Sequence, residues 1–155
     1  MADLQAKEQP TRLVDVKYAV VMALAVTAVA VAVRWNRGDV DLCRDVFRGM
    51  VQGNVAVARR IDWAHLQALH VDIGAQYSQI TDPKVQSVYR QVFINRFAEG
   101  FKYGGGQAVS FVNWRLKERT PQGVVVAADY PAKQKILLFT LSTSGPKRVT
   151  AIRWQ

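Results

Sequence analysis

The feature that most constrains this chain is an apolar segment near its start, YAVVMALAVTAVAVAV at residues 18–33. Thr27 is the one polar interruption, and the segment is bounded by Lys17 and Arg34. A helix that crosses a bilayer needs roughly 20 residues, and flanking basic side chains can reach the headgroups and lengthen the usable span. A soluble amphipathic helix would carry a polar stripe. The sequence therefore predicts a transmembrane helix at residues 18–35.

A cleaved signal peptide is the alternative interpretation of this segment. Its alternating alanines, Ala28, Ala30 and Ala32, supply the A-x-A pattern found before signal cleavage sites. Against this, basic and acidic side chains balance in residues 1–17, whereas a signal peptide begins with a basic region. We therefore expect an N-terminal tail at residues 1–17, an uncleaved anchor in a bacterial inner membrane and an exported C-terminal domain. The basic residues on the two sides of the span are nearly balanced, so its orientation stays open.

Residues 36–155 are long enough for one domain with its own core. The net charge of +9 lies entirely beyond the apolar segment. Such a domain is attracted to anionic headgroups, to acidic proteins or to nucleic acid, although positive charge also serves solubility alone. No nucleic-acid-binding motif accompanies the charge, so nucleic acid is not the expected partner. The single cysteine, Cys43, falls at an apolar helical position and reads as a buried hydrophobe.

The first part of the domain reads as helical. Residues 36–39 form a break in which Asp39 is a candidate N-cap, and the helix that follows should end at Gly53. Asn54 can cap a short second helix that runs through Arg60.

The next segments predict two further helices. DWAHLQALH at residues 62–70 reads as a capped helix, and residues 71–80 read as a connection. Asp82 and Pro83 then mark the start of the longest helix of the domain. Its apolar residues recur at steps of three and four, and we expect it to end at the glycines of 104–106.

From Gln107 onward the apolar period changes from that of a helix to two. Strands are expected at residues 107–119, 124–130, 136–141 and 149–154. The loops between them are short, which favours an antiparallel meander. The sequence therefore predicts an α+β domain, in which short helices and one long helix pack on a curved four-stranded antiparallel sheet.

This order of elements resembles the nuclear transport factor-like superfamily, whose cystatin-like cones include SnoaL-like domains. The resemblance lies in a Gly-Asn break, the phrase IDWAHLQAL, a long helix with VYRQVFINRFAEGF and a final strand with KRVTAIRW. It implies a long helix in the concavity of a bent sheet, with a cone-shaped pocket between them. Within this fold, a domain behind one span is similar to the periplasmic domain of secretion-system assembly proteins of the VirB-eight type.

Polar residues that could line such a pocket are His65, His70, Tyr77 and Asp129. The two histidines are five residues apart, which is not the spacing that places two metal ligands on one helix face, and a zinc site lacks enough ligands. No catalytic motif, cofactor site or metal site is indicated. Catalysis by a pocket enzyme of isomerase or hydrolase type, or small-molecule binding, remains the alternative to a non-catalytic module.

Basic residues alternate along the first predicted strand and recur on its neighbours. We expect them to share an outer face of the sheet as a docking surface for a protein partner or an anionic lipid surface. The members of this candidate surface are Arg115, Lys117, Arg119, Lys133, Lys135 and Arg153. The prediction is thus a single-pass, membrane-anchored binding or assembly module that forms a homodimer or a protein complex.

Overall fold

The computed structural model describes residues 11–155 of the chain, with side chains from Tyr18 onward. It divides into two compact units, the first ending at Asn36 and the second comprising Arg37–Gln155, which we call the folded unit. Helix α1, Thr11–Val51, contributes residues to both units. Residues 1–10 of the predicted tail lie outside the described residues, and its last seven residues are the start of α1.

In the first unit, the side chains of α1 are exposed although they are apolar. The large apolar side chains between Tyr18 and Trp35 are 45% to 68% exposed. From Tyr18 onward the helix is long and apolar enough to cross a membrane, and none of its most apolar stretch is buried. The core helix of a soluble domain would be mostly buried, so this helix is compatible with a membrane anchor or with a signal sequence.

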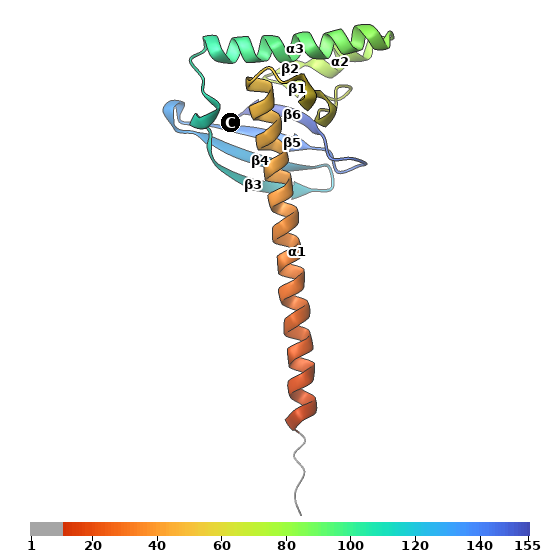
Figure 1. Cartoon of the computed structure of the whole chain (residues 1–155), viewed down its shortest axis with the longest axis vertical. Coiled ribbons are helices and arrows are strands. Elements are labelled where there is room, and N and C mark those ends of the chain that lie inside the picture. Colours follow the sequence, from red (N-terminus) through yellow and green to blue (C-terminus); the bar gives the residue numbers. More distant parts are fainter. Residues whose placement is uncertain (1–10) are drawn as a thin grey trace, which may run out of the picture. The chain divides into compact units, whose positions relative to one another are not determined.

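The folded unit contains helices first and the longer strands afterwards, which confirms the α+β class (Figure 1). After α1 its elements in chain order are η1 (Val55–Arg60), β1 (Gln67–Ala68), β2 (Val71–Asp72), α2 (Ile73–Ser78), α3 (Pro83–Tyr103), η2 (Ala108–Ser110), β3 (Val112–Thr120), β4 (Gly123–Tyr130), η3 (Pro131–Lys133), β5 (Lys135–Leu141) and β6 (Val149–Trp154). The first predicted strand is shorter than expected, because a 3-10 turn precedes β3.

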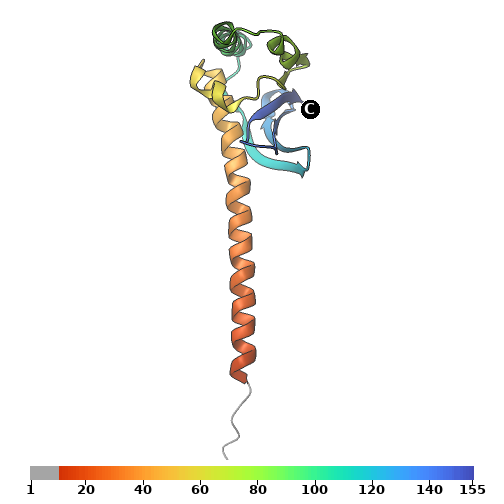
Figure 2. The same cartoon turned by 90° about the vertical axis from the view of Figure 1, so that its right-hand side faces the viewer.

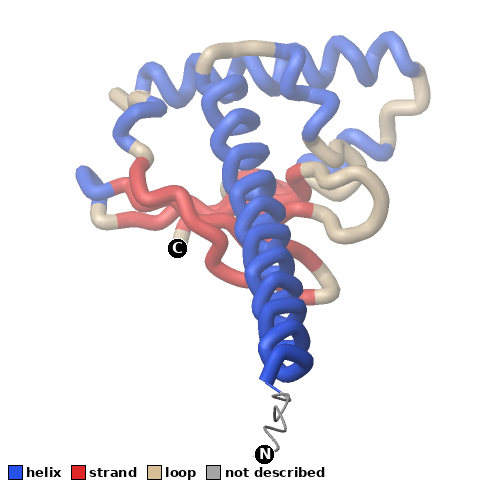
Figure 3. The backbone as a smooth tube through the Cα atoms, turned by 60° about the horizontal axis from the view of Figure 1, so that its bottom comes forward, coloured by secondary structure: helices blue, strands red, loops and turns tan. Residues whose placement is uncertain are grey.

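The strands form one six-stranded sheet in the order β2-β1-β6-β5-β4-β3, so the prediction of four antiparallel strands was wrong (Figure 3). Strands β3 to β6 are the expected antiparallel meander. The additional strand β1 pairs parallel with β6 and antiparallel with β2. Each of these two strands has two residues, which is too short for an alternating pattern to be read from the sequence.

The link between β1 and β2 explains why the helix predicted at residues 62–70 was wrong. Leu69 and His70 both have positive φ, 50° and 75°. Two central residues with positive φ make a tight hairpin turn that Asn-Gly usually signals, and a right-handed helix cannot continue through them. The predicted connection at 71–80 instead holds β2 and α2, and Asp72 caps α2 by accepting a hydrogen bond from the Ala75 amide at 3.0 Å.

The core of the folded unit lies on one face of the sheet, which we call the inner face. Its centre is Phe47 of α1, 1% exposed, whose ring packs against Phe111 and Phe139 at centroid distances of 4.6 and 5.9 Å. Trp114 and Phe101 pack against the same ring. A fully buried aromatic residue contributes roughly 3 kcal/mol by burial alone. The concave side of the sheet is therefore filled largely by aromatic side chains.

Asp39 is not the helix cap that the sequence suggested, because α1 runs through it without a break. Its side chain is 2% exposed. One carboxylate oxygen accepts a hydrogen bond from Nη2 of Arg119 at 2.7 Å, and the other accepts one from Nζ of Lys147. This ion pair fixes the α1 segment of the folded unit to β3 and to the loop before β6. A partner 80 or more residues away leaves no local signal, which is why the sequence pattern was misread.

Helix α3 begins and ends as predicted, at the Asp82 cap and before Gly104. The Asp82 side chain accepts a hydrogen bond from the Lys84 amide at 2.8 Å. Ile94 is the one residue of α3 that is fully buried. In Figures 1 and 2 the helix lies above the sheet, with α2 near one end. The long helix thus lies over the inner side of the folded unit and reaches its core through Ile94 and the partly buried Phe97 and Phe101.

Candidate functional site

The candidate basic surface is split by the register of the sheet. Alternate residues of β4 to β6 that point away from the core define an outer face, and no helix of residues 37–155 covers it (Figure 2). Across this face the register aligns Arg115, Ala127, Leu138 and Arg153 in one row. The two central residues are 0% and 4% exposed although they face outward. Long basic side chains stand at the ends of the row, and the stems of such side chains can cover apolar neighbours.

Lys117 belongs to the same region of the outer face. Its ammonium donates a hydrogen bond to the side-chain oxygen of Gln155, at the end of β6. Strands β4 and β5 lie between these two residues in the sheet order. The contact therefore reaches across the width of the meander and adds to the cover over Ala127 and Leu138.

The other members of the predicted surface lie elsewhere. Arg119 pairs with Val124 in register, on the inner face, and contacts buried Asp39. Lys133 is in the turn η3, and the ammonium of Lys135 lies 5.9 Å from the ring centre of Trp154, in a cation–π contact. The basic residues thus occupy both faces and one end of the sheet.

Asp129 has a structural environment on the outer face, not a place in a pocket. Its carboxylate accepts a hydrogen bond from Nη1 of Arg115 at 2.8 Å and another from the side-chain amide of Asn113 at 3.2 Å. Those hydrogen bonds, from Arg115 first and Asn113 second, lower the pKa of Asp129. Asn113 has a φ of 52° and lies at an irregularity in the β3–β4 pairing. Asp129 therefore stabilises a bulge in β3.

The two histidines are exposed and do not lie in a cavity. Nδ1 of His65 is 3.1 Å from a carboxylate oxygen of Asp62, and the His65 side chain is 75% exposed. His70 lies in the β1–β2 turn. Neither residue lines one of the four best-defined cavities of the described structure. The contact lies within a turn in which the His65 amide donates a hydrogen bond to the Asp62 carbonyl at 3.2 Å, so it has a local structural role.

Tyr77 is buried, 9% exposed, between α2 and α3. Its hydroxyl donates to the side-chain oxygen of Gln86 at 3.2 Å and accepts from Nη1 of Arg90 at 3.4 Å. Its ring contacts Trp63 and Tyr89. The candidate Tyr77 thus joins α2 to α3, and it does not point into a cavity.

Two neighbouring cavities lie between α3 and the rest of the folded unit. The first has a volume of about 410 Å³ and the second about 310 Å³. Both are lined by Leu69 of the β1–β2 turn and by Arg96 and Phe97 of α3. Ligand sites in proteins have volumes of about 300 to 1,000 Å³, so either cavity has the size of a small-ligand site.

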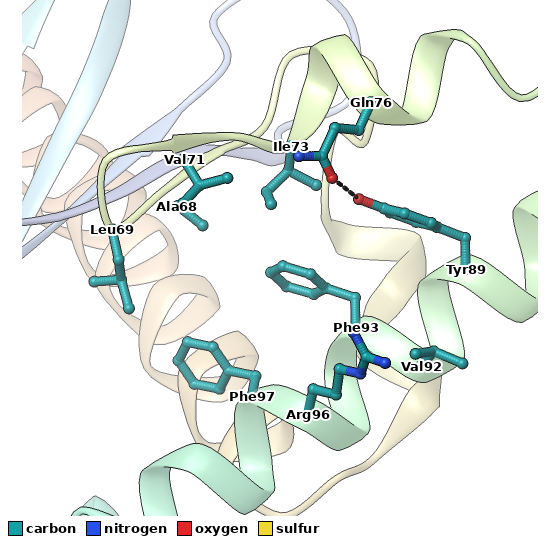
Figure 4. A pocket seen from close by; sticks show the side chains of 10 residues that line it. All are labelled: Ala68, Leu69, Val71, Ile73, Gln76, Tyr89, Val92, Phe93, Arg96 and Phe97. Atoms are coloured by element: carbon teal, nitrogen blue, oxygen red, sulfur yellow. Dashed lines mark hydrogen bonds between the residues drawn. The ribbon is translucent and has the colours of Figure 1, made fainter.

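The first cavity is shown in Figure 4. Ala68, Leu69 and Val71 form one wall, and the side chains of α3 form the opposite wall. Two polar residues in its lining bond to each other: the hydroxyl of Tyr89 donates a hydrogen bond to the side-chain oxygen of Gln76 at 3.1 Å. Burial raises the pKa of Tyr89, which keeps this phenol protonated as a donor.

The second cavity is lined mainly by aromatic and aliphatic side chains of the core. They come from α1, α3, β5 and β6 and the residue after η2, and include Phe47, Phe101, Phe111, Leu137, Ile152 and Trp154. Arg96 is the one charged residue in this lining. It also lines the first cavity, where it is again the one charged residue. The geometry therefore places one guanidinium where two apolar cavities meet.

Arg96 was not among the candidates drawn from the sequence. A signal was available, because Arg96 continues the helical spacing of Val85, Val88 and Val92 on α3. A charged residue on an apolar stripe of a helix is unusual. It indicates either that the charged end bends outward to solvent or that it makes a specific polar interaction.

No group of three or more His, Cys, Asp or Glu side chains within the described residues could hold a metal ion. Cys43 is 0% exposed, so the buried role expected for it agrees with the structure.

Comparisons with known proteins add no assignment. No protein-family model, no curated protein and no solved structure matches this chain. The chemistry of the site is therefore derived from its own residues.

Proposed function

We propose that this chain is a membrane-anchored, non-catalytic binding module whose folded unit contacts an anionic surface, either an acidic protein partner or the headgroups of the bilayer. In this proposal α1 is an uncleaved single span, the membrane is a bacterial inner membrane, and the folded unit is exported. The observation that carries the proposal is an imbalance of charge: the aspartates of the folded unit are engaged internally, whereas many basic side chains are not.

Every aspartate of the folded unit has a partner within it. Four of them form ion pairs with lysine or arginine: Asp39, Asp41, Asp45 and Asp129. One contacts a histidine and two cap helices: Asp62, Asp72 and Asp82. Of the six basic candidates, four have no carboxylate partner in the residues with described side chains: Lys117, Lys133, Lys135 and Arg153. An external anionic surface would supply the missing partners, at about 1 kcal/mol for each well-placed basic residue.

The fold is consistent with this role. We propose that the folded unit is a divergent cone of the nuclear transport factor-like type, supported by a long helix over the inner side of a curved mixed sheet. Domains of that type serve many unrelated purposes, so the function is argued from the charges and not from the fold.

The test is hydrogen exchange on the full-length protein in nanodiscs, made either of phosphatidylcholine alone or with added phosphatidylserine. Anionic lipid should slow amide exchange in β3, η3 and β6. The triple variant Lys117→Gln, Lys133→Gln and Arg153→Gln should lose that protection. A control triple, Lys84→Gln, Lys102→Gln and Arg148→Gln, removes the same charge elsewhere and should retain it.

The protein-partner form of the proposal gives a different result. Protection would then be independent of lipid charge and would appear only when native membranes are present, together with a crosslinked product through Lys117 or Lys133. Equal exchange in both lipids and no crosslink in native membranes would contradict the proposal in both forms.

A second candidate function, small-molecule binding, is favoured by the two cavities between α3 and the sheet. An enzyme of isomerase or hydrolase type would need an acid or base in these cavities. His65, His70, Tyr77 and Asp129 do not line them. Tyr89 does line the first cavity, but its hydroxyl is held in a hydrogen bond to Gln76. The cavities therefore support ligand binding more than catalysis.

A further inference from the structure

The region where the two cavities meet combines an apolar space with one unmatched charge. Arg96 lines both cavities. Within the residues with described side chains, its guanidinium makes no ion pair and no hydrogen bond. Glu99 is three residues further along α3, at a spacing that permits a pair, but the two do not form one. Arg96 is exposed, so its guanidinium is open to solvent and to an anion that arrives from outside the chain.

The chemistry of a guanidinium limits what that anion can be. Arginine presents five N–H donors in a planar fork that matches a carboxylate or a phosphate in a two-pronged contact. The lining of the adjoining second cavity contains no other charged residue and includes Phe101, Phe111 and Trp154. A ligand that satisfies both features has a single anionic head and an apolar body.

We propose that this groove is a binding site for a long-chain carboxylate, with the head at Arg96 and the acyl chain in the second cavity. The complementarity of charge between Arg96 and a carboxylate selects this occupant over an uncharged chain. The site meets the candidate basic surface at Trp154, over whose ring the Lys135 ammonium lies. Its ligand does not depend on the function proposed for that surface.

Gly100 provides a way to close the site without unfolding the protein. It lines the second cavity, and a Cβ added to it would meet nothing within 4 Å. Gly100 lies inside α3, so replacement by leucine also raises helix propensity. Gly100→Leu should therefore fill part of the cavity while leaving the fold intact.

The test uses the full-length protein in phosphatidylcholine nanodiscs and a palmitic acid probe that carries a photoreactive diazirine near its tail. We expect mass spectrometry to place adducts in the segments around Phe101, Phe111 and Trp154. Arg96→Gln should reduce labelling of these segments by about tenfold or more, because it removes a charge-assisted contact. Arg148→Gln, a matched change at an exposed arginine outside both cavities, should leave it unchanged. Gly100→Leu should abolish it.

The corresponding palmityl alcohol with the same diazirine serves as a control, because it has the same apolar chain but no charge. It distinguishes recognition of the carboxylate from nonspecific apolar partition. We expect weak labelling by the alcohol and no effect of Arg96→Gln on it. Equal labelling by acid and alcohol would overturn the assignment of a carboxylate site. Adducts confined to residues 18–36 would show bilayer partition only, and would overturn the site altogether. An unlabelled groove in a protein that crosslinks as a dimer through α3 would assign the groove to a second copy of the chain, and would also overturn it.

Discussion

The inner strands of the sheet and helix α3 are both rich in apolar residues, yet the structure treats them differently. On β4 and β5, Val124, Val126 and Phe139 are 0% exposed. On α3, Val85 and Val88 are 50% and 59% exposed. The sheet has Phe47 and its neighbours packed directly on it, whereas α3 reaches the core through one buried residue, Ile94, and a few partly buried rings, and it borders two cavities on that side. We infer from this difference that packing of the sheet against the α1 segment provides most of the stability. The exposed apolar side chains of α3 are a surface for contact with other molecules.

The strongest way to break this comparison is to truncate one apolar side chain in each region. Phe139→Ala should lower the free energy of unfolding by about 3 to 5 kcal/mol, because it leaves a cavity among packed aromatic rings. Val88→Ala on α3 should change it by no more than about 0.5 kcal/mol. Urea unfolding of the full-length protein in one detergent measures both. Comparable losses would mean that α3 is as firmly packed as the sheet.

A smaller effect is expected where α1 is fixed to the sheet by charge. Asp39→Ala removes the shared partner of Arg119 and Lys147. We expect a loss of about 1 to 3 kcal/mol, below the 3 to 5 kcal/mol typical of a broken buried pair. The reason is that both cations are 40% exposed and can be hydrated once the carboxylate is gone. The same urea experiment provides the measurement, and hydrogen exchange should show faster opening of α1 than of α3. A variant as stable as the natural protein would show that the ion pair does not hold α1 in place.

The smallest effect sharpens the comparison at the outer face of the sheet. The pKa of Asp129 is lowered by its bonds to Arg115 and Asn113. A carboxyl group with a lowered folded-state pKa stabilises the fold above its unfolded pKa of about 3.9 and loses that contribution as the pH falls through the folded value. Asp129→Asn should therefore be less stable than the natural protein near pH 7, and the gap should shrink below about pH 4. Denaturant midpoints across this range give the answer, and a gap independent of pH would argue against a charged role for Asp129.

Much of the fold followed from local patterns. The cap at Asp82, Pro83 at the first helical position and the stop at Gly104 defined α3 correctly, since each signal acts within a few residues. The meander from β3 to β6 was predicted from alternation and short loops. What failed depended on distant partners. The residues next to Asp39 in the sequence suggest a helix cap. Its actual partners, on β3 and in the loop before β6, are distant in the sequence and are known only from the folded structure.

The candidate site shows the same limit. The pocket candidates were chosen by residue type, and the positions that line the cavities were decided by how α3 crosses the folded unit. Arg96 was missed although it continues the spacing of the valines on α3, because a single arginine on an apolar stripe also fits a solvated side chain. The valine stripe of α3 is identified as one wall of a cavity only when the opposite wall, which includes Leu69, is known from the structure.

Leu69 gives the β1–β2 turn a consequence for evolution and for engineering. A leucine with left-handed φ costs roughly 1 to 2 kcal/mol of backbone energy that glycine does not, and its side chain is shared by both cavity walls. Leu69→Gly would relieve the backbone and at the same time remove part of the partition between the two spaces. A search for heat-resistant variants would favour that change, and the groove would become wider as a result. Selection for thermal stability and selection for ligand specificity would therefore favour different residues at this position.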